Sequence, residues 1–386
     1  MAVVTRGRAW PVLLTALVLT VLSGLLLPGP ASAEGVSGES TVYTNTVTGG
    51  DGPRTPDIIS TSANNAVVAW REGLRPGNHD MGYIRYAYTT DGGANWSRPQ
   101  TLAQETSDYA WHYVILYQAG SELFAYMGRT PIVDTSENDG DSWNKDGLPI
   151  STTVVKRSTD EGHTWQDYPA TFPNIGNLVF AGRPLKLANG KHAIPYWATG
   201  RENGVLTSSD LKTWTKEGTV PGGNADGIKA GEPQIAVSQD GTNKLVMVAR
   251  SENANAVTAE SSTDGASWTP FDPDAALPSQ NTSKGYFTKD SNGKYLYIYN
   301  SPVADSSAAD YRDVLNYKTR RPGAAWSAAK LFANGSSNDE VDTAGTGRGW
   351  DTYAMADEYA PGKFYVVWEF DTTRIKVNKL DISDAP

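Results

Sequence analysis

Short apolar runs, each about the length of one β-strand, alternate along this chain with segments rich in Gly, Pro, Asp and Asn. Clear examples occupy residues 66–70, 295–299 and 363–368. Such runs bounded by turn residues are typical of β-strands, and no sustained helical spacing of apolar residues occurs after residue 33. The 38 Gly, 22 Pro, 12 Trp and 19 Tyr fit many short strands joined by tight turns. We therefore predict an all-β fold.

The first 33 residues follow a different pattern. Arg6 and Arg8 precede an almost unbroken apolar run at residues 12–27, and Ala31-Ser32-Ala33 has the small residues of a cleavage site. These features predict a secretory signal peptide that is cleaved near Ala33, which would make the protein secreted. The apolar run is short for a membrane span, and no other segment approaches one, so we expect no membrane span.

A turn motif that ends in Trp recurs along residues 34–386. Residues 89–96, with the sequence TTDGGANW, recur as STDEGHTW at 158–165, and contracted copies occupy 208–214 and 262–268. A copy without the Asp ends at Trp326, and one with Asn138 in its place ends at Trp143. The Asp can accept backbone N–H groups within a turn, Gly supplies positive φ, and Trp packs beneath the hairpin.

The spacing of this motif fits blades of a β-propeller. With Trp143 left out, the motifs end at Trp96, Trp165, Trp214, Trp268 and Trp326, at intervals of 69, 49, 54 and 58 residues. Each interval accommodates four strands and their loops. The motifs are identified as Asp boxes, the hairpin signature of sialidase-type propellers. Five blades with a box and a final one without predict a single six-bladed β-propeller over residues 34–386. The boxes themselves are structural and do not define a function.

The chain resembles the sialidase family in several short segments that occur in family order. Arg54-Thr55-Pro56 is similar to the Arg-Ile-Pro element, and His79-Asp80 precedes the first Asp box where sialidases have their acid/base Asp. Gly231-Glu232-Pro233 is followed by a hairpin and Arg250. Tyr311-Arg312-Asp313 resembles the segment of the third Arg, and Thr352-Tyr353 precedes a hairpin that ends at Glu369.

This resemblance implies a role for each matched residue. Arg54, Arg250 and Arg312 would bind the substrate carboxylate, and Glu369 would orient Arg54. Tyr353 would be the nucleophile, Glu232 its base and Asp80 the acid/base. Three Arg suit a carboxylate because they form charge-assisted, partly bidentate bonds. A neutral Tyr avoids the repulsion that this carboxylate would impose on a carboxylate nucleophile. Taken singly, Glu232 could be an exposed turn residue and Tyr353 a packing residue.

Residues 109–113 depart from the usual pattern of the family. Sialidases line the pocket around the sugar's 4-position and N-acyl group there, and this chain has Trp111 and His112 instead. We expect Trp111 and His112 to contact the substrate, which leaves the exact acidic sugar open. The alternative is that Trp111 and Tyr113 pack between blades and His112 lies at the rim.

Charge and metal-ligand content narrow the other options. The net charge is −10 and no basic cluster occurs, so we expect no nucleic-acid partner. Zero Cys excludes disulfides and thiol chemistry. The remaining His residues, His163 and His192, form no metal-ligand spacing with His79 and His112. We therefore expect no metal, no cofactor, a glycan substrate with a terminal acidic sugar, and a monomer.

Three functions remain open from the sequence. The first is a retaining exo-glycosidase that removes terminal α-linked sialic acid or a related 2-keto-3-deoxy acidic sugar. The second is a polysaccharide lyase, in which His112 or a Tyr would take the proton next to a uronate carboxylate. The third is a non-catalytic glycan-binding propeller, which would have no reason to retain a buried Glu, Asp and Tyr around three Arg.

Overall fold

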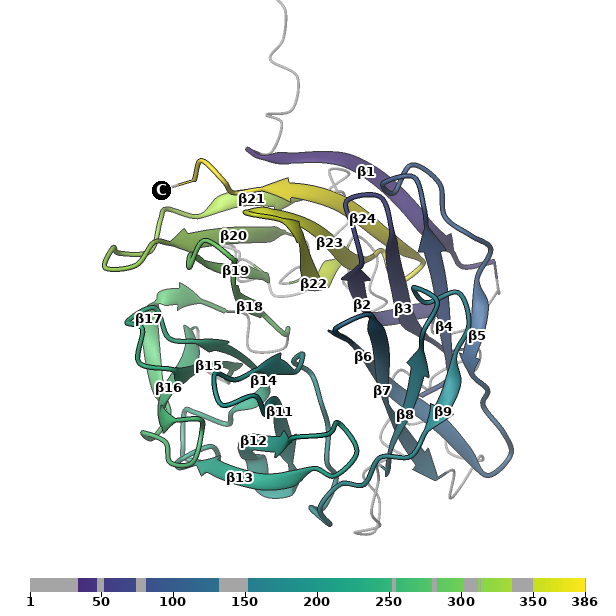
Figure 1. Cartoon of the computed structure of the whole chain (residues 1–386). Helices are drawn as coiled ribbons and strands as arrows, with labels where there is room; N and C mark the ends of the chain where they lie inside the picture. Colours follow the sequence, from purple (N-terminus) through teal and green to yellow (C-terminus); the bar gives the residue numbers. More distant parts are fainter. Residues whose placement is uncertain are drawn as a thin grey trace, which may run out of the picture. The chain divides into compact units, whose positions relative to one another are not determined.

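The computed structural model describes residues 34–46, 52–73, 81–131, 152–251, 255–279, 283–300, 312, 314–334 and 350–385. These residues all lie within one compact unit, Ala33–Pro386. Its strands form six separate four-stranded antiparallel sheets, and Figure 1 shows these sheets arranged around a common centre. The six-bladed β-propeller predicted from the sequence is therefore confirmed. In the described ranges, no helix is long and apolar enough to cross a membrane.

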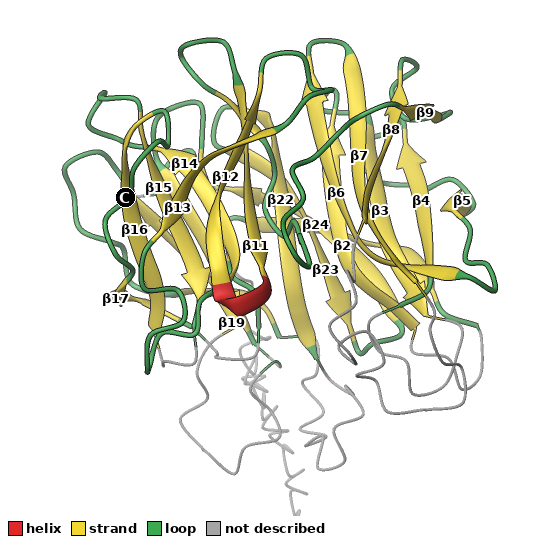
Figure 2. Cartoon of the chain, turned by 90° about the horizontal axis from the view of Figure 1, so that it is seen from below, coloured by secondary structure: helices red, strands yellow, loops and turns green. Residues whose placement is uncertain are grey.

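The first five blades each take four consecutive strands of the chain. Blade 1 consists of β2 (Gly52–Ser60), β3 (Ala66–Gly73), β4 (Tyr83–Thr89) and β5 (Gln100–Ala103). Blade 2 consists of β6 (Tyr109–Ala119), β7 (Glu122–Pro131), β8 (Thr152–Ser158) and β9 (Gln166–Tyr168). Blade 3 consists of β10 (Leu185–Lys186), β11 (His192–Ala198), β12 (Glu202–Ser208) and β13 (Thr215–Val220), with a 3-10 turn (Thr199–Arg201) joining β11 to β12 (Figure 2).

The second half of the chain continues this order and then closes the ring. Blade 4 consists of β14 (Gly231–Val237), β15 (Lys244–Arg250), β16 (Asn255–Thr263) and β17 (Asp272–Pro278). Blade 5 consists of β18 (Tyr286–Lys289), β19 (Tyr295–Asn300), β20 (Leu315–Arg320) and β21 (Lys330–Ala333). Blade 6 consists of β22 (Asp351–Ala360), β23 (Lys363–Phe370), β24 (Arg374–Asp381) and the N-terminal β1 (Val36–Thr44).

The Trp of each Asp box lies in the same hairpin of its blade. Trp96, Trp165, Trp214, Trp268 and Trp326 all lie between the third and fourth strands of blades 1 to 5, as the repeat predicted. In the first box, Asp91 accepts hydrogen bonds from the Thr89 hydroxyl (2.8 Å) and from the backbone N–H of Asn95 (2.9 Å). The same pair of bonds recurs around Asp160. The turn chemistry of the motif is therefore local and repeated.

The core lies between neighbouring blades, where the two faces of each sheet are covered. Strands β3, β19 and β23 contain the three apolar runs predicted from the sequence, and almost all side chains of these strands are buried. Aromatic rings fill much of the space between blades, including Trp70, Tyr126 and Trp368, each at most 1% exposed. This packing fixes how each blade is oriented, and with it the strand ends that face the centre.

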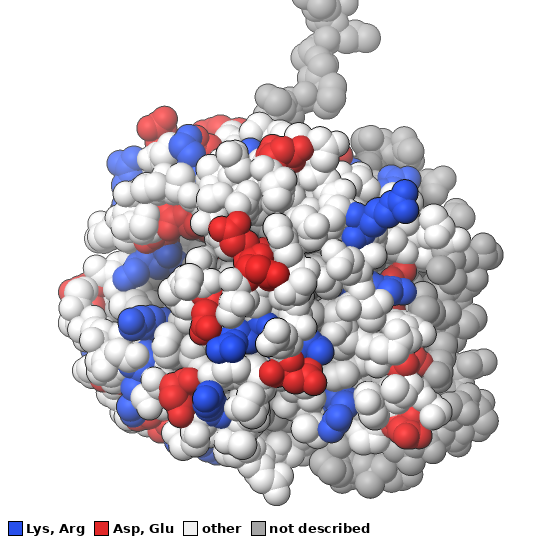
Figure 3. Space-filling view, turned by 45° about the vertical axis from the view of Figure 1, so that its right-hand side comes forward, with Lys and Arg blue, Asp and Glu red and all other residues white. Residues whose placement is uncertain are grey.

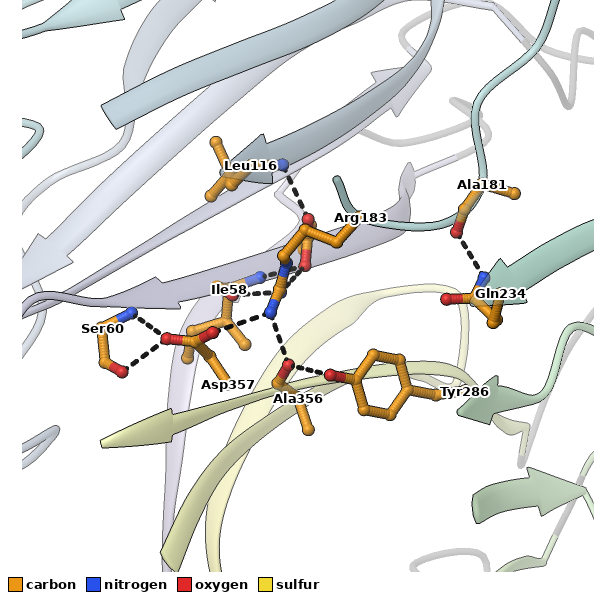
Figure 4. Close-up of polar contacts among 10 residues, drawn as sticks. Ile58, Ser60, Leu116, Ala181, Arg183, Gln234, Tyr286, Ala356 and Asp357 are labelled. Atoms are coloured by element: carbon orange, nitrogen blue, oxygen red, sulfur yellow. Dashed lines mark hydrogen bonds and ion pairs between the residues drawn. The ribbon is translucent and has the colours of Figure 1, made fainter. Parts of the chain in front are cut away.

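An ion-pair cluster joins four blades at the centre of the ring. Arg183 donates to the carboxylate of Asp57 in β2, to Asp357 in β22 (2.8 Å) and to the carbonyl of Ala356 (2.7 Å). Asp57 also accepts from the backbone N–H of Leu116 in β6 (2.7 Å). Figure 4 shows these groups converging on one guanidinium. Although burial alone would lower it, the two carboxylates raise the pKa of Arg183 above its usual value.

Candidate active site

A cavity of about 340 Å³ opens at the beginning of the innermost strands. Its lining includes residues of every blade, among them Thr55, His112, Arg201, Glu232, Lys284 and Tyr353. A second cavity of about 360 Å³ shares none of these residues and is lined by the opposite ends of the inner strands, including Ser60, Val237 and Glu358. Of the residues matched to the sialidase family, Glu232, Arg250 and Tyr353 line the first cavity.

Bulges in the inner strands turn four side chains out of the regular alternation. The strand register shifts between Arg54 and Asp57 in β2, and between Trp111 and Val114 in β6. Equivalent shifts occur at the start of β14, around Glu232, and of β22, around Tyr353. Thr55, Glu232 and Tyr353 have positive φ of 46°, 53° and 53°. Non-glycine residues with positive φ are uncommon and concentrate at functional sites, where a bulge re-aims a side chain.

The three predicted Arg and the predicted nucleophile lie together. Arg250 Nη1 donates a long hydrogen bond to the Tyr353 hydroxyl (3.5 Å), and the Arg312 guanidinium lies 5.4 Å from the Tyr353 ring centre. Arg54 and Arg312 lie 5.8 and 4.6 Å from the ring of Trp350. Arg54 comes from blade 1, Arg250 from blade 4, and Arg312 from the segment between β19 and β20 of blade 5, so the fold brings distant segments to one point.

Two carboxylates hold this group of Arg in position. Glu369 lies opposite Thr352 in the β22–β23 pair, is 1% exposed, and accepts from Arg54 Nη1 (3.5 Å) and from the backbone N–H of Thr55. Glu232 Oε2 lies 3.0 Å from Arg250 Nη1. Burial raises the pKa of Glu369, against the opposing effect of Arg54. Arg54 and Arg250 are therefore each held in place by a carboxylate.

Glu232 and Tyr353 both contact Arg250, and in the described part of the chain no direct hydrogen bond joins their two side chains. The family resemblance makes Glu232 the base for Tyr353, a role that requires the carboxylate to come within hydrogen-bond reach of the hydroxyl. Among the described residues, the only hydrogen bond of that hydroxyl is the one from Arg250, whose Nη1 also pairs with Glu232. Burial, and then the Glu232 carboxylate, raise the pKa of Tyr353 to about 12. Tyr353 is thus a neutral phenol that needs a base to become a nucleophile.

A polar cluster fixes the beginning of β22 next to Tyr353. Asn300, which ends β19, donates from Nδ2 to the carbonyl of Asp351 (2.7 Å), and its Oδ1 accepts from the hydroxyl of Thr352 (2.8 Å). The Ser283 and Thr352 hydroxyls are 2.8 Å apart. All four side chains are buried. Buried groups that satisfy one another in this way restrict the backbone on which Tyr353 lies.

The other predicted site residues differ in where they lie. His112 lines the cavity, but Trp111 does not: it is 6% exposed and packs in the core between blades 1 and 2, where its Nε1 donates to the carbonyl of Gln104 (2.8 Å). Trp111 thus packs between blades, whereas its neighbour His112 lines the cavity, since successive side chains of a strand point to opposite faces of the sheet. Asp80 and His79 lie outside the described residues.

Sequence reasoning missed several residues of this cavity. Arg201 is the last residue of the 3-10 turn, has a φ of 59°, and lies 5.6 Å from the ring of Trp197, which also lines the cavity. Lys284 lies 5.7 Å from the Tyr353 ring. Lys284 lies just before β18, the innermost strand of blade 5. Its position corresponds to those of Thr55, Glu232 and Tyr353 near the start of the innermost strands of blades 1, 4 and 6. Aligning the blades on their first strands would have identified it.

Comparisons with known proteins agree with this architecture. The family model of the BNR repeat-like domain matches residues 64–360. The chain belongs to the BNR repeat-like family. No curated protein matches the chain. The resemblance to sialidases with Asp-box repeats is thereby confirmed at the level of repeats and fold.

Several solved structures share the propeller at low sequence identity. A Dyadobacter fermentans protein of unknown function has a TM-score of 0.68 at 16% identity, covering 90% of this chain and 99% of its own. The Hadza microbial sialidase Hz136 has a TM-score of 0.68 at 14% identity, covering 90% and 69%. The intramolecular trans-sialidase of Ruminococcus gnavus has a TM-score of 0.64 at 14% identity, covering 92% and 99%. At these identities the similarity concerns the fold.

One face of the molecule shows how the charged side chains are distributed. On the face drawn in Figure 3, Lys and Arg are interspersed with Asp and Glu rather than gathered in one basic patch. Among the described residues, no group of three or more His, Cys, Asp or Glu is arranged to hold a metal ion.

Proposed function

We propose that this protein is a retaining exo-glycosidase that removes terminal α-linked sialic acid, or a related 2-keto-3-deoxy acidic sugar, from glycans. The observation that supports this most is the convergence of Arg54, Arg250 and Arg312 around Tyr353. Sugars of this class carry a carboxylate directly on the anomeric carbon. A site that binds that carboxylate through three guanidinium groups brings the anomeric carbon to the nucleophile.

The proposed reaction proceeds in two displacements. Glu232 takes the proton of the Tyr353 hydroxyl while the phenol oxygen attacks the anomeric carbon, and Asp80 gives a proton to the departing glycan oxygen. The sugar is then bonded to Tyr353 through an aryl glycoside. In the second step Asp80 takes a proton from water, the water oxygen attacks the same carbon, and Tyr353 leaves and regains its proton from Glu232. Two inversions retain the α configuration.

We also propose that the protein acts outside the cell, since residues 1–33 have the pattern of a signal peptide. Export would bring the cavity to glycans of the surroundings.

A panel of fluorogenic α-ketosides tests the proposed activity. It contains the N-acetylneuraminic and deaminated sugars together with a uronide that has no carboxylate on its anomeric carbon. We expect release of the fluorophore from one of the α-ketosides and none from the uronide. No release from any α-ketoside, with binding of the free acid retained, would favour the non-catalytic glycan-binding alternative.

Matched Arg variants test the carboxylate grip in the same assay. Arg312→Met should lower kcat/KM by roughly 30-fold to several thousand-fold, because loss of a partly desolvated charge partner removes about 2–5 kcal/mol. Arg374→Met, in β24 and outside the cavity lining, should leave kcat/KM nearly unchanged. Equal effects of the two substitutions would contradict the proposed grip.

A further inference from the structure

Lys284 is a buried cation beside the proposed nucleophile. Its side chain is 5% exposed and lines the same cavity as Tyr353. Its Nζ lies 5.7 Å from the centre of the Tyr353 ring. None of the roles assigned so far involves this lysine.

Lys284 lacks the partners that buried lysines normally have. Within the described ranges it forms no hydrogen bond and no ion pair. Lys294, which is equally buried, donates instead to the carbonyls of Ile382 (2.6 Å) and Ala385 (2.7 Å). An unpartnered buried ammonium is unfavourable, so a fold that retains one at a cavity wall indicates a functional use.

The local structure fixes Lys284 in this place. The preceding residue, Ser283, is buried and hydrogen-bonded to Asn300 and Thr352, the cluster that begins β22. The following residue, Gly285, has no room for a Cβ, which would lie 2.6 Å from the ring of Tyr297. Because the same cluster holds the backbone of Lys284 and that of Tyr353, the two side chains keep one relative position.

Charged groups from several blades face Lys284. Glu232 of blade 4, Asp57 of blade 1 and Glu369 of blade 6 favour its charged form, whereas Arg183 opposes it. Burial is the largest influence and lowers the pKa of Lys284. None of these carboxylates forms an ion pair with Lys284 among the described residues, so its charge is not neutralised by a direct partner and acts on the Tyr353 ring 5.7 Å away.

We propose that Lys284 is a positioning residue whose ammonium stabilises the Tyr353 phenolate. The phenolate develops when Glu232 removes the Tyr353 proton, and again when the sugar leaves Tyr353 in the second displacement. A positive charge close to the ring favours both changes, since the negative charge is delocalised into the ring. This role rests on the proposed function, but the coupling between the two side chains can be measured without any substrate.

Fluorine NMR of a single 3-fluorotyrosine introduced at position 353 reports the ionisation of this residue alone. Lys284→Met should raise the pKa of that phenol by at least about one pH unit, because a partly buried charge at this distance is weakly screened. Lys284→Gln should act in the same direction, and Lys284→Arg should restore most of the effect. Lys289→Met is the matched control, since Lys289 lies in β18, lines the other cavity and donates to the Ser238 carbonyl (3.0 Å).

Kinetics distinguish a role through Tyr353 from direct substrate binding. On α-ketosides, Lys284→Met should lower kcat by about tenfold or more with little change in KM, and Lys284→Arg should recover most of the loss. A raised KM with unchanged kcat would overturn the proposal, because it would indicate that Lys284 contacts the substrate. A 3-fluorotyrosine pKa that moves no more in Lys284→Met than in Lys289→Met would overturn it as well.

A measurement on the unsubstituted lysine covers the case in which neither neutral variant folds. Nitrogen-15 NMR of lysine-labelled protein should show a charged Lys284 amine at the pH of maximal activity, and a neutral amine there would overturn the proposal. If the protein hydrolyses no α-ketoside but the fluorine shift appears, the coupling stands and the proposed function fails. If the protein hydrolyses an α-ketoside but the fluorine shift does not appear, the proposed function stands and the proposed role of Lys284 fails.

Discussion

Glu369 and Tyr353 are both buried ionisable groups, but their surroundings favour different protonation states. Glu369 is held between Arg54 and the backbone N–H of Thr55, so its charged form has partners although burial raises its pKa. Tyr353 has a pKa of about 12, and its ring is flanked by the cations of Arg312 and Lys284. Glu369 therefore orients an Arg, whereas Tyr353 stays neutral until a base acts on it.

Tyr353→Phe removes one oxygen and very little packing. Among the described residues, the hydroxyl accepts one long bond, from Arg250, so the melting temperature should stay within a few degrees of that of the unsubstituted protein. Activity on a natural glycoside should fall by orders of magnitude, because the covalent intermediate can no longer form. Calorimetry and sugar release measure the two effects. Full activity in Tyr353→Phe would contradict the assigned nucleophile.

Some site residues could be predicted from the sequence, and others depend on geometry that the sequence does not show. Glu232 and Tyr353 stand in short segments that resemble a known family. Lys284 stands in an undistinguished Ser-Lys-Gly segment and matters only because its inner strand begins beside β22. Trp111 was expected at the cavity with its neighbour His112, but it packs between blades 1 and 2, and the sequence does not show which face of β6 meets the neighbouring blade.

At the scale of elements, the inner strands position the side chains of the site, whereas the outer hairpins stabilise the blades. The beginnings of β2, β14 and β22 contain the bulges and positive φ values that direct Thr55, Glu232 and Tyr353. The Asp-box hairpins lie far out along each blade and contain none of the cavity lining. Regular repeats thus maintain the blades, and departures from regularity occur where the chemistry is proposed.

The Asp-box hairpin of blade 2 packs against blade 1, and a pair of glycines tests this contact. Gly162 and Gly190 have nearly equal φ, 86° and 87°. A Cβ at Gly162 would lie 2.3 Å from Cγ2 of Val67, whereas one at Gly190 would meet nothing within 4 Å. Both Gly→Ala changes strain the backbone by roughly 1–2 kcal/mol. Gly162→Ala should lose about 1–3 kcal/mol more from overpacking.

Urea unfolding of the two variants measures the difference. Because the backbone strain is matched, the extra loss in Gly162→Ala reports the contact between blades. Equal free energies of unfolding for Gly162→Ala and Gly190→Ala would show that packing of the Asp box against the neighbouring blade does not contribute to stability.

At the scale of the whole ring, closure depends on one strand from each end of the chain. β1 pairs with β24 and completes blade 6, so the first and last strands of the fold share a sheet. The repeat predicted the number of blades because each Asp box marks one hairpin. It could not predict how the ring closes, since blade 6 has no box and β1 has no sequence signal for its distant partner.

A disulfide across this closure should stabilise the ring. Ser37 and Lys379 face one another in the β1–β24 pair, and the chain contains no other Cys. The double substitution Ser37→Cys and Lys379→Cys, once oxidised, should raise stability by about 2–4 kcal/mol, because the bond joins the two ends of the fold. The same variant after reduction is the control. A confirmed disulfide without a higher melting temperature would indicate that separation of β1 does not limit stability.

The central claim is that Tyr353 and the three Arg catalyse a double displacement at an anomeric carbon that carries a carboxylate. Proton NMR of the first product, recorded before the released sugar equilibrates, tests this claim most directly. The account predicts that the α anomer appears first and converts to the β anomer only later. An initial β anomer, or an unsaturated product formed by elimination, would contradict it.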